Sequence, residues 1–82
     1  MAIYELWLER PDGKYVAHFD RLPPERGTPN FASTPMESPL AAAHALRNEL
    51  RRWMTADDQF RIRSRSNIYD NINDAIEDML RN

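Results

Sequence analysis

The chain has 82 residues, of which 41% are hydrophobic, 11 are Lys or Arg and 13 are Asp or Glu, giving a formal net charge of −2. This length supports one small domain, residues 1–82, with a thin core, and the absence of cysteine excludes disulfides, thiolate nucleophiles and cysteine-ligated zinc. The mild negative charge gives no strong general attraction to nucleic acid, and without a leader-like start or an apolar run of about 18 residues we expect a cytoplasmic protein.

The first two segments form a predicted β-hairpin. Residues 2–9 and 14–19 are rich in aromatic and aliphatic side chains that partly alternate with polar ones, as in strands. Between them, Pro11-Asp12-Gly13 supplies a fixed φ, a side chain that can cap the turn, and a residue free to take a positive φ. The register stays open. One face of the first strand consists of Tyr4, Leu6 and Leu8. In one register the second strand places Tyr15, Ala17 and Phe19 on this face, and in the other register it places Val16 there.

The middle of the chain predicts a loop, a short strand and the main helix. Residues 20–29 contain three prolines and a glycine, which predicts an exposed loop, and residues 30–34 could form a third strand with Phe31 inward. Ser38 as N-cap and Pro39 at the first helical position predict a helix that runs to Met54. Its apolar face is Ala43, Leu46, Leu50, Trp53 and Met54, and its basic face includes Arg47 and Arg51.

The two tryptophans, Trp7 and Trp53, are both expected in the core. A tryptophan that proved exposed would instead be the first candidate for an interface hot spot, because Trp is enriched among the residues that contribute most to binding.

The last third predicts one strand and one amphipathic helix. Residues 59–65 alternate, with Phe60 and Ile62 on one side and Arg61, Arg63 and Arg65 on the other. The final helix has apolar residues from Ile68 to Leu80 at helical spacing, and Ser66, Asp70 or Asn71 could cap it. Opposite its apolar face runs an acidic stripe of Asp70, Asp74, Glu77 and Asp78. The order β-β-β-α-β-α predicts an α+β fold, a small antiparallel sheet with two helices packed on one face.

Several of these segments resemble the small HicB-type antitoxin domain, a reduced RNase H-like unit. The similarity rests on Tyr4, on the turn and second strand at residues 12–19, on Leu22-Pro23 and on the Ala-rich helix that begins at Ser38. It covers about the first two thirds of the chain, without the family's usual Pro-Gly-Cys continuation or a DNA-binding extension. The resemblance implies a non-catalytic protein that blocks a partner which processes nucleic acid.

No combination of residues defines a reaction. His18 and His44 have no metal-ligand spacing near them, so no metal site or cofactor is expected, and we interpret them as a half-buried strand histidine and a solvated helix histidine. Asp57 and Asp58 lie in a predicted turn, and we interpret them as residues that cap the segment that follows. RNase H-type catalysis needs several converging carboxylates, whereas the predicted strands contribute Glu5 and Glu9. The sequence therefore predicts that the protein is not an enzyme.

The charged surfaces carry the functional prediction. The leading hypothesis is a protein-binding inhibitor, of the antitoxin type or of the phage anti-defence type that includes anti-CRISPR proteins, which occludes a nucleic-acid-processing partner. Its contacts would be the acidic stripe of the last helix together with the arginines of the fourth strand and main helix, if these adjoin. The alternatives are RNA or DNA binding through Arg61, Arg63 and Arg65, and a structural homodimer. The strand arginines could instead pair with Glu5, Glu9 or the acidic helix.

Overall fold

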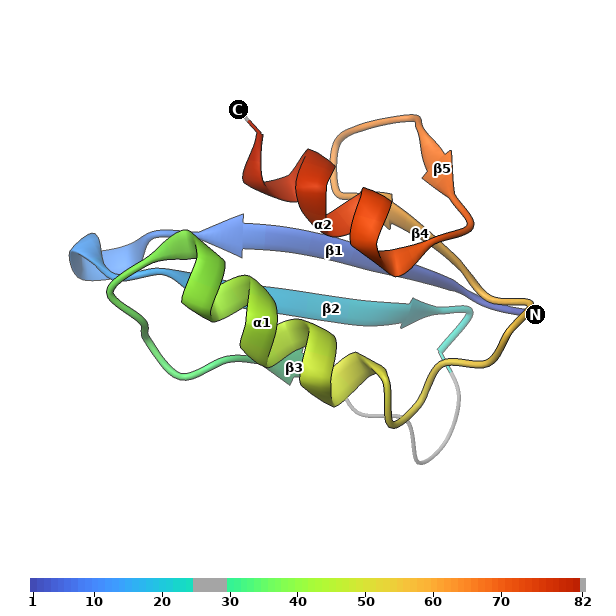
Figure 1. The fold of residues 1–82 in the computed structure, drawn as a ribbon, viewed down its shortest axis with the longest axis horizontal. Coiled ribbons are helices and arrows are strands. Elements are labelled where there is room, and N and C mark those ends of the chain that lie inside the picture. Colours follow the sequence, from blue (N-terminus) through green and yellow to red (C-terminus); the bar gives the residue numbers. More distant parts are fainter. Residues whose placement is uncertain (25–29, 82) are drawn as a thin grey trace.

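A computed structural model describes residues 1–24 and 30–81 as one sheet covered by two helices (Figure 1). Both helices lie on the same face of the five-stranded sheet, whose strand order is β3-β2-β1-β4-β5. This confirms the α+β class. In chain order the elements are β1 (Ile3–Glu9), a short 3₁₀ turn (Pro11–Gly13), β2 (Val16–Leu22), β3 (Phe31–Ala32), α1 (Pro39–Leu50), β4 (Gln59–Ile62), β5 (Ile68–Tyr69) and α2 (Ile72–Leu80).

The sheet is mixed, so the prediction of an antiparallel sheet is wrong. β1 pairs antiparallel with β2 but parallel with β4, where Tyr4 lies beside Phe60 and Leu6 beside Ile62. The reason lies in the connection between β3 and β4, which is the helix α1. A helical crossover returns the chain to the same end of the sheet, so the next strand runs in the same direction. β3 and β1 both run antiparallel to β2, and β4 therefore runs parallel to β1.

The hairpin of β1 and β2 sets which residues form the core. Leu6 pairs with Phe19 and Leu8 with Ala17, which confirms the first of the two registers that the sequence left open. At the turn, Asp12 and Gly13 have positive φ angles of 53° and 81°. The buried strand residues are Tyr4, Leu6, Ala17, Phe19, Phe60 and Ile62, and the helices cover them with Ala42, Ala43, Leu46, Leu50, Ile72, Ala75, Ile76 and Met79.

The helix α1 begins as the sequence predicts. The Ser38 hydroxyl accepts a hydrogen bond from the Ala41 N–H at 3.1 Å, and Pro39 occupies the first turn. The helix ends at Leu50, earlier than predicted, so Trp53 lies beyond it and is 37% exposed. The expectation of Trp53 in the core is therefore wrong. Among the described residues, neither helix has the length and apolar character needed to cross a membrane.

The C-terminal segments differ from prediction at their ends. β4 stops at Ile62, before the predicted end at Arg65, because Ser64 takes a positive φ of 73° and turns the chain. Ile68 belongs to the edge strand β5, since it pairs with Arg61. The prediction that it lies on the last helix is wrong, because its four-residue spacing from Ile72 matches a helical period by chance. Asn71 is the actual N-cap of α2, and its side chain accepts from the Asn73 N–H at 2.8 Å.

The other loops and strands shift more modestly. The predicted strand at residues 30–34 is reduced to Phe31–Ala32, and β2 extends to Leu22, into the predicted loop. The rest of that Pro-rich loop, residues 25–29, lies outside the described residues.

We expect Leu46→Ala to lower the free energy of unfolding by about 2–5 kcal/mol, because it removes a fully buried side chain from the contact between α1 and the sheet. Leu40, on the same helix, is 52% exposed, and Leu40→Ala should change stability by less than about 0.5 kcal/mol. Urea unfolding followed by circular dichroism measures both. Equal losses would contradict this account of the core.

Candidate functional site

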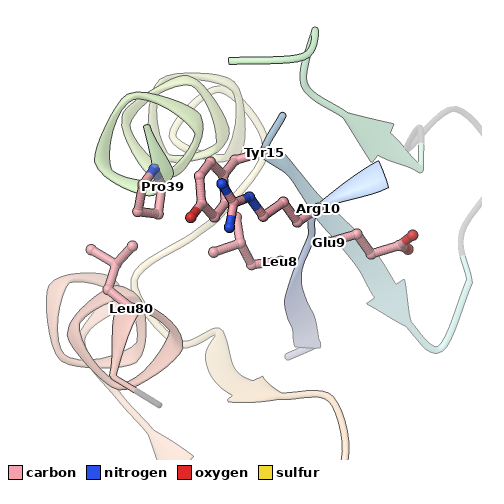
Figure 2. Close-up of a pocket in the computed structure, with 6 residues that line it drawn as sticks. All are labelled: Leu8, Glu9, Arg10, Tyr15, Pro39 and Leu80. Atoms are coloured by element: carbon pink, nitrogen blue, oxygen red, sulfur yellow. The ribbon is translucent and has the colours of Figure 1, made fainter. Parts of the chain in front are cut away.

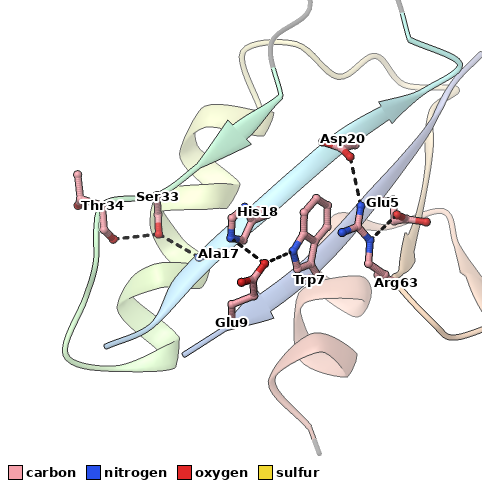
Figure 3. A network of polar contacts seen from close by, with 9 residues as sticks. All are labelled: Glu5, Trp7, Glu9, Ala17, His18, Asp20, Ser33, Thr34 and Arg63. Carbon is pink, nitrogen blue, oxygen red and sulfur yellow. Dashed lines mark hydrogen bonds and ion pairs between the residues drawn. The ribbon is translucent and has the colours of Figure 1, made fainter. Parts of the chain in front are cut away.

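The face of the sheet that the helices leave uncovered carries a connected network of polar side chains. Successive residues of a strand point to opposite faces, so the positions that alternate with the core residues lie here. We call this surface the open face. Its polar and aromatic side chains are Glu5, Trp7, Glu9, His18, Asp20, Arg61 and Arg63, and all of them except Arg61 are drawn in Figure 3.

Trp7 lies at the centre of the open face with both sides of its indole covered. The His18 ring stacks on it at a centroid distance of 4.8 Å and an interplanar angle of 3°. The Arg63 guanidinium lies over the indole at 3.4 Å. β2 and the β4 end flank β1 on opposite sides, so His18 and Arg63 enclose the indole between them, as Figure 3 shows. We call this arrangement the Trp7 stack.

Carboxylates fix the Trp7 stack at its edges. Glu9 accepts a hydrogen bond from the Trp7 indole N–H at 2.9 Å and lies 3.4 Å from His18 Nε2. Arg63 donates from Nε to Glu5 at 2.8 Å and pairs with Asp20 at 3.3 Å. Each of the three stacked side chains is thus held by at least one carboxylate, which restricts their rotamers and pre-organises the surface.

Glu5 is the most connected carboxylate of the open face. It accepts from Arg61 Nη2 at 3.0 Å as well as from Arg63, and its side chain is only 14% exposed. The Arg63 hydrogen bond, with support from Arg61, holds the pKa of Glu5 below its ordinary value, although partial burial opposes the shift. Glu5 is therefore the anion that neutralises two strand arginines.

Arg65 does not share a surface with Arg61 and Arg63, so the predicted row of three arginines is wrong. The turn at Ser64 breaks the strand alternation and directs Arg65 to α2. There it binds the Asp78 carboxylate and donates to the backbone carbonyls of Asp78 at 2.8 Å and Arg81 at 3.0 Å. Arg65 caps the C-terminal end of the helix, where a cation is favoured.

The predicted basic surface between the main helix and the fourth strand does not form either. Arg47 lies on α1 and Arg51 is its C-cap, and α1 covers the face of the sheet opposite the open face that holds Arg61 and Arg63. Arg47 is half-buried and donates to Asn73 Oδ1 on α2 at 3.1 Å, while Arg51 is exposed. The four strand and helix arginines therefore belong to separate surfaces.

The acidic stripe of the last helix is shorter than predicted, because Asp70 precedes the Asn71 N-cap and lies outside α2, and because Asp78 is buried. Asp78 is buried, at 7% exposure, where Arg65 binds it and the Tyr69 hydroxyl donates to it at 2.9 Å. The three remaining carboxylates are exposed: Asp70, which accepts from Gln59 at 2.8 Å, Asp74, and Glu77, which pairs with Arg81 at 3.0 Å.

Trp7 is the functional candidate that the sequence placed wrongly, since it is half-buried on the open face and outside the core cluster. The signal was present in the strand itself. Glu5, Trp7 and Glu9 share one parity, and Tyr4 and Leu6 the other, so a strict period of two would have put Trp7 beside the two glutamates. Its aromatic size had favoured the core.

The remaining polar groups serve structure. Asp58 is buried and accepts from the N–H groups of Ala2 at 2.9 Å and Thr55 at 2.8 Å, so it caps the turn before it and the N-terminal segment, and not, as predicted, the segment that follows. His18 is half-buried and His44 exposed, as expected. Within residues 1–24 and 30–81, no three His, Cys, Asp or Glu side chains come together as a metal site.

We expect Glu5→Gln to lower the free energy of unfolding at pH 7 by about 1–2 kcal/mol, because it weakens two charge-assisted hydrogen bonds. The pKa of Glu5 is lower in the folded than in the unfolded chain, so its contribution is fully present above the ordinary value of 4.5 and is lost as pH falls through the folded pKa. Denaturation of both proteins across pH 2–7 tests this. A gap that persists at the acid end would contradict it.

We expect Arg65→Gln to cost about 1–3 kcal/mol of stability, because it leaves the buried Asp78 carboxylate with less hydrogen bonding. Arg51→Gln is the matched control, since Arg51 is exposed and should cost less than about 0.5 kcal/mol. Thermal unfolding compares the two. If both variants unfold with the parent, Arg65 has no structural role.

Comparison with known proteins finds no family model, no curated protein and no solved structure that matches the chain.

Proposed function

We propose that this chain is a non-catalytic protein-binding module, that it acts by occluding a partner protein, and that the open face is its main contact surface. The observation that carries the proposal is the Trp7 stack, in which an aromatic and an arginine side chain are fixed on a solvent-facing sheet. Trp and Arg are the residue types most enriched at interface hot spots. Side chains held in place before binding lose little conformational entropy when a partner covers them.

The charges of the open face favour a protein over nucleic acid. Arg61 and Arg63 are the guanidinium groups of this surface, and the carboxylates Glu5 and Asp20 already pair with them. Glu9 adds a further negative charge. A phosphate backbone would have to displace these carboxylates, which offsets the counterion release that drives nucleic-acid binding.

The geometry of Trp7 supports the same choice. Single-stranded nucleic acid is held by bases that stack on exposed aromatic faces. Both faces of the Trp7 indole are occupied, one by His18 and the other by Arg63, so a base meets only the edge of the ring.

The proposal for the partner rests on the resemblance to the HicB-type domain and on the exposed carboxylates of α2 and of Asp70, which precedes its N-cap. We infer that the partner handles nucleic acid, as a toxin or a defence complex does, and that this chain acts as an antitoxin-type or phage anti-defence inhibitor. Enzymes of this kind present Lys and Arg along a groove. Asp70, Asp74 and Glu77 would meet such a groove with complementary charge.

The experiment is a capture of partners from a lysate of the source cell, with and without nuclease, by the tagged chain and by two single-tryptophan variants. We expect a stoichiometric protein that survives nuclease. Trp7→Ala should weaken its binding by about 30-fold or more, since the loss of a hot spot costs about 2 kcal/mol or more. By exposure Trp53 is also a hot-spot candidate, but its indole N–H donates to Glu49 of α1 and it is not part of the open face, so Trp53→Ala should change affinity by less than about threefold.

The other outcomes separate the alternatives. Recovery of nucleic acid, with proteins lost on nuclease treatment, would overturn the proposal in favour of direct binding through Arg61 and Arg63. A doubled mass in light scattering, with no other partner, would indicate a structural homodimer. Equal effects of the two tryptophan variants would remove the open face from the proposal.

A further inference from the structure

A pocket of about 300 Å³ opens at the end of the domain where β1 stops, away from the Trp7 stack. It lies between the first turn of α1 and the last turn of α2, above the end of the β1–β2 hairpin (Figure 2). We propose that it binds a peptide segment of a partner protein in which an aliphatic or aromatic side chain stands next to Asp or Glu. This inference rests on the proposed protein-binding function, but on a different surface.

The lining of the pocket is mixed, and its apolar part is continuous with the core. Leu8, Tyr15 and Leu80 are half-buried and pack against the core cluster, and Pro39 faces Leu80 across the opening. An inserted apolar side chain would bury its own surface and that of these walls, which is worth roughly 25 cal/mol per Å². The volume is at the lower end of the range for small-molecule sites, which is about 300–1,000 Å³, and suits one or two side chains.

The rim of the pocket carries one cation, Arg10. Its guanidinium lies 4.8 Å from the centroid of the Tyr15 ring, and its Nε donates to the Gly13 carbonyl at 3.3 Å. Within the described parts of the chain, no carboxylate pairs with it. A cation held against an aromatic ring at the edge of an apolar pocket is placed to receive a carboxylate from a bound segment.

The neighbouring charges do not cancel Arg10. Glu9 contributes to the lining, but its carboxylate points away from the pocket toward the open face, where it binds Trp7 and His18 (Figure 2). Lys14 and Glu37 neutralise each other at 3.1 Å. Near the end of α2, Arg65 binds the carbonyls of Asp78 and Arg81. Among the described residues that line the pocket, Arg10 is therefore the charged group that forms no ion pair.

The test is a selection of random 12-residue peptides on the full chain, run in parallel on Arg10→Glu and on Arg51→Glu, an exposed arginine elsewhere. The parent and Arg51→Glu should enrich peptides with an apolar residue next to Asp or Glu. Arg10→Glu should bind those peptides at least tenfold more weakly and enrich apolar residues next to Lys or Arg instead. Arg10 is exposed and outside the core, and circular dichroism checks that the variant is folded.

Two results would overturn the proposal: no enrichment of acidic residues by the parent, or the same selection by Arg10→Glu. Titration of a selected peptide into labelled protein locates its site. Amide shifts should centre on Leu8, Arg10 and Tyr15, and shifts centred on Trp7 would place the peptide on the open face and reject the pocket.

The same peptide separates this proposal from the function proposed above. Trp7→Ala should leave peptide affinity within about twofold of the parent while it weakens capture of the whole partner. If Trp7→Ala has no effect on capture but Arg10→Glu abolishes peptide binding, the open face is rejected and the pocket stands.

Discussion

One-sided coverage of the sheet is the constraint on which the rest of the structure depends. Two helices of the described chain pack on the same face of five strands, so the core cluster lies on that side. Val16, which pairs with Glu9, is a buried apolar residue on the opposite face. The opposite face then has to stay in contact with water or with a partner, because no further segment of the described chain covers it. Its strands meet this requirement with charged side chains that pair across neighbouring strands, around a single aromatic residue.

This arrangement explains why the open face is both polar and rigid. Lone charged side chains on a sheet are mobile, and exposed ion pairs usually contribute little to stability. Here Arg63 contacts three partners, since it lies over Trp7 and pairs with Glu5 and Asp20, and Arg61 pairs with the same Glu5. Recognition by such a surface depends on its shape and on the pattern of its charges, since the charges nearly cancel in sum.

Local signals in the sequence predicted the structure well where neighbours along the chain decide it. The Ser38 cap, the Asp12-Gly13 turn and the alternation of Phe60 with Ile62 needed only adjacent residues. The failures involve distant segments. The direction of β4 depends on the path of α1, and the burial of Asp78 depends on a turn at Ser64 that redirects Arg65.

For the candidate site, the sequence predicted which residue types take part but not which of them contact one another. The sequence identified Arg61 and Arg63, and it named Glu5 as a possible partner, but pairs separated by more than 50 positions depend on strand register. The sequence predicts Trp7 in the core because its side chain is large and apolar, although the alternation along β1 puts it on the same face as Glu5 and Glu9. The pocket beside Arg10 gave no signal at all, since it is made by the ends of elements that meet only in the folded chain.

The place of β1 in the sheet has a consequence for synthesis on the ribosome. β1 is the central strand and is translated before its parallel neighbour β4, which is 56 positions later, so one edge of β1 has no partner until β4 has emerged. An unpaired strand edge is a template for wrong association. The nascent chain therefore gains protection of this edge only with β4, and a message interrupted before β4 would release a product with an open, aggregation-prone edge.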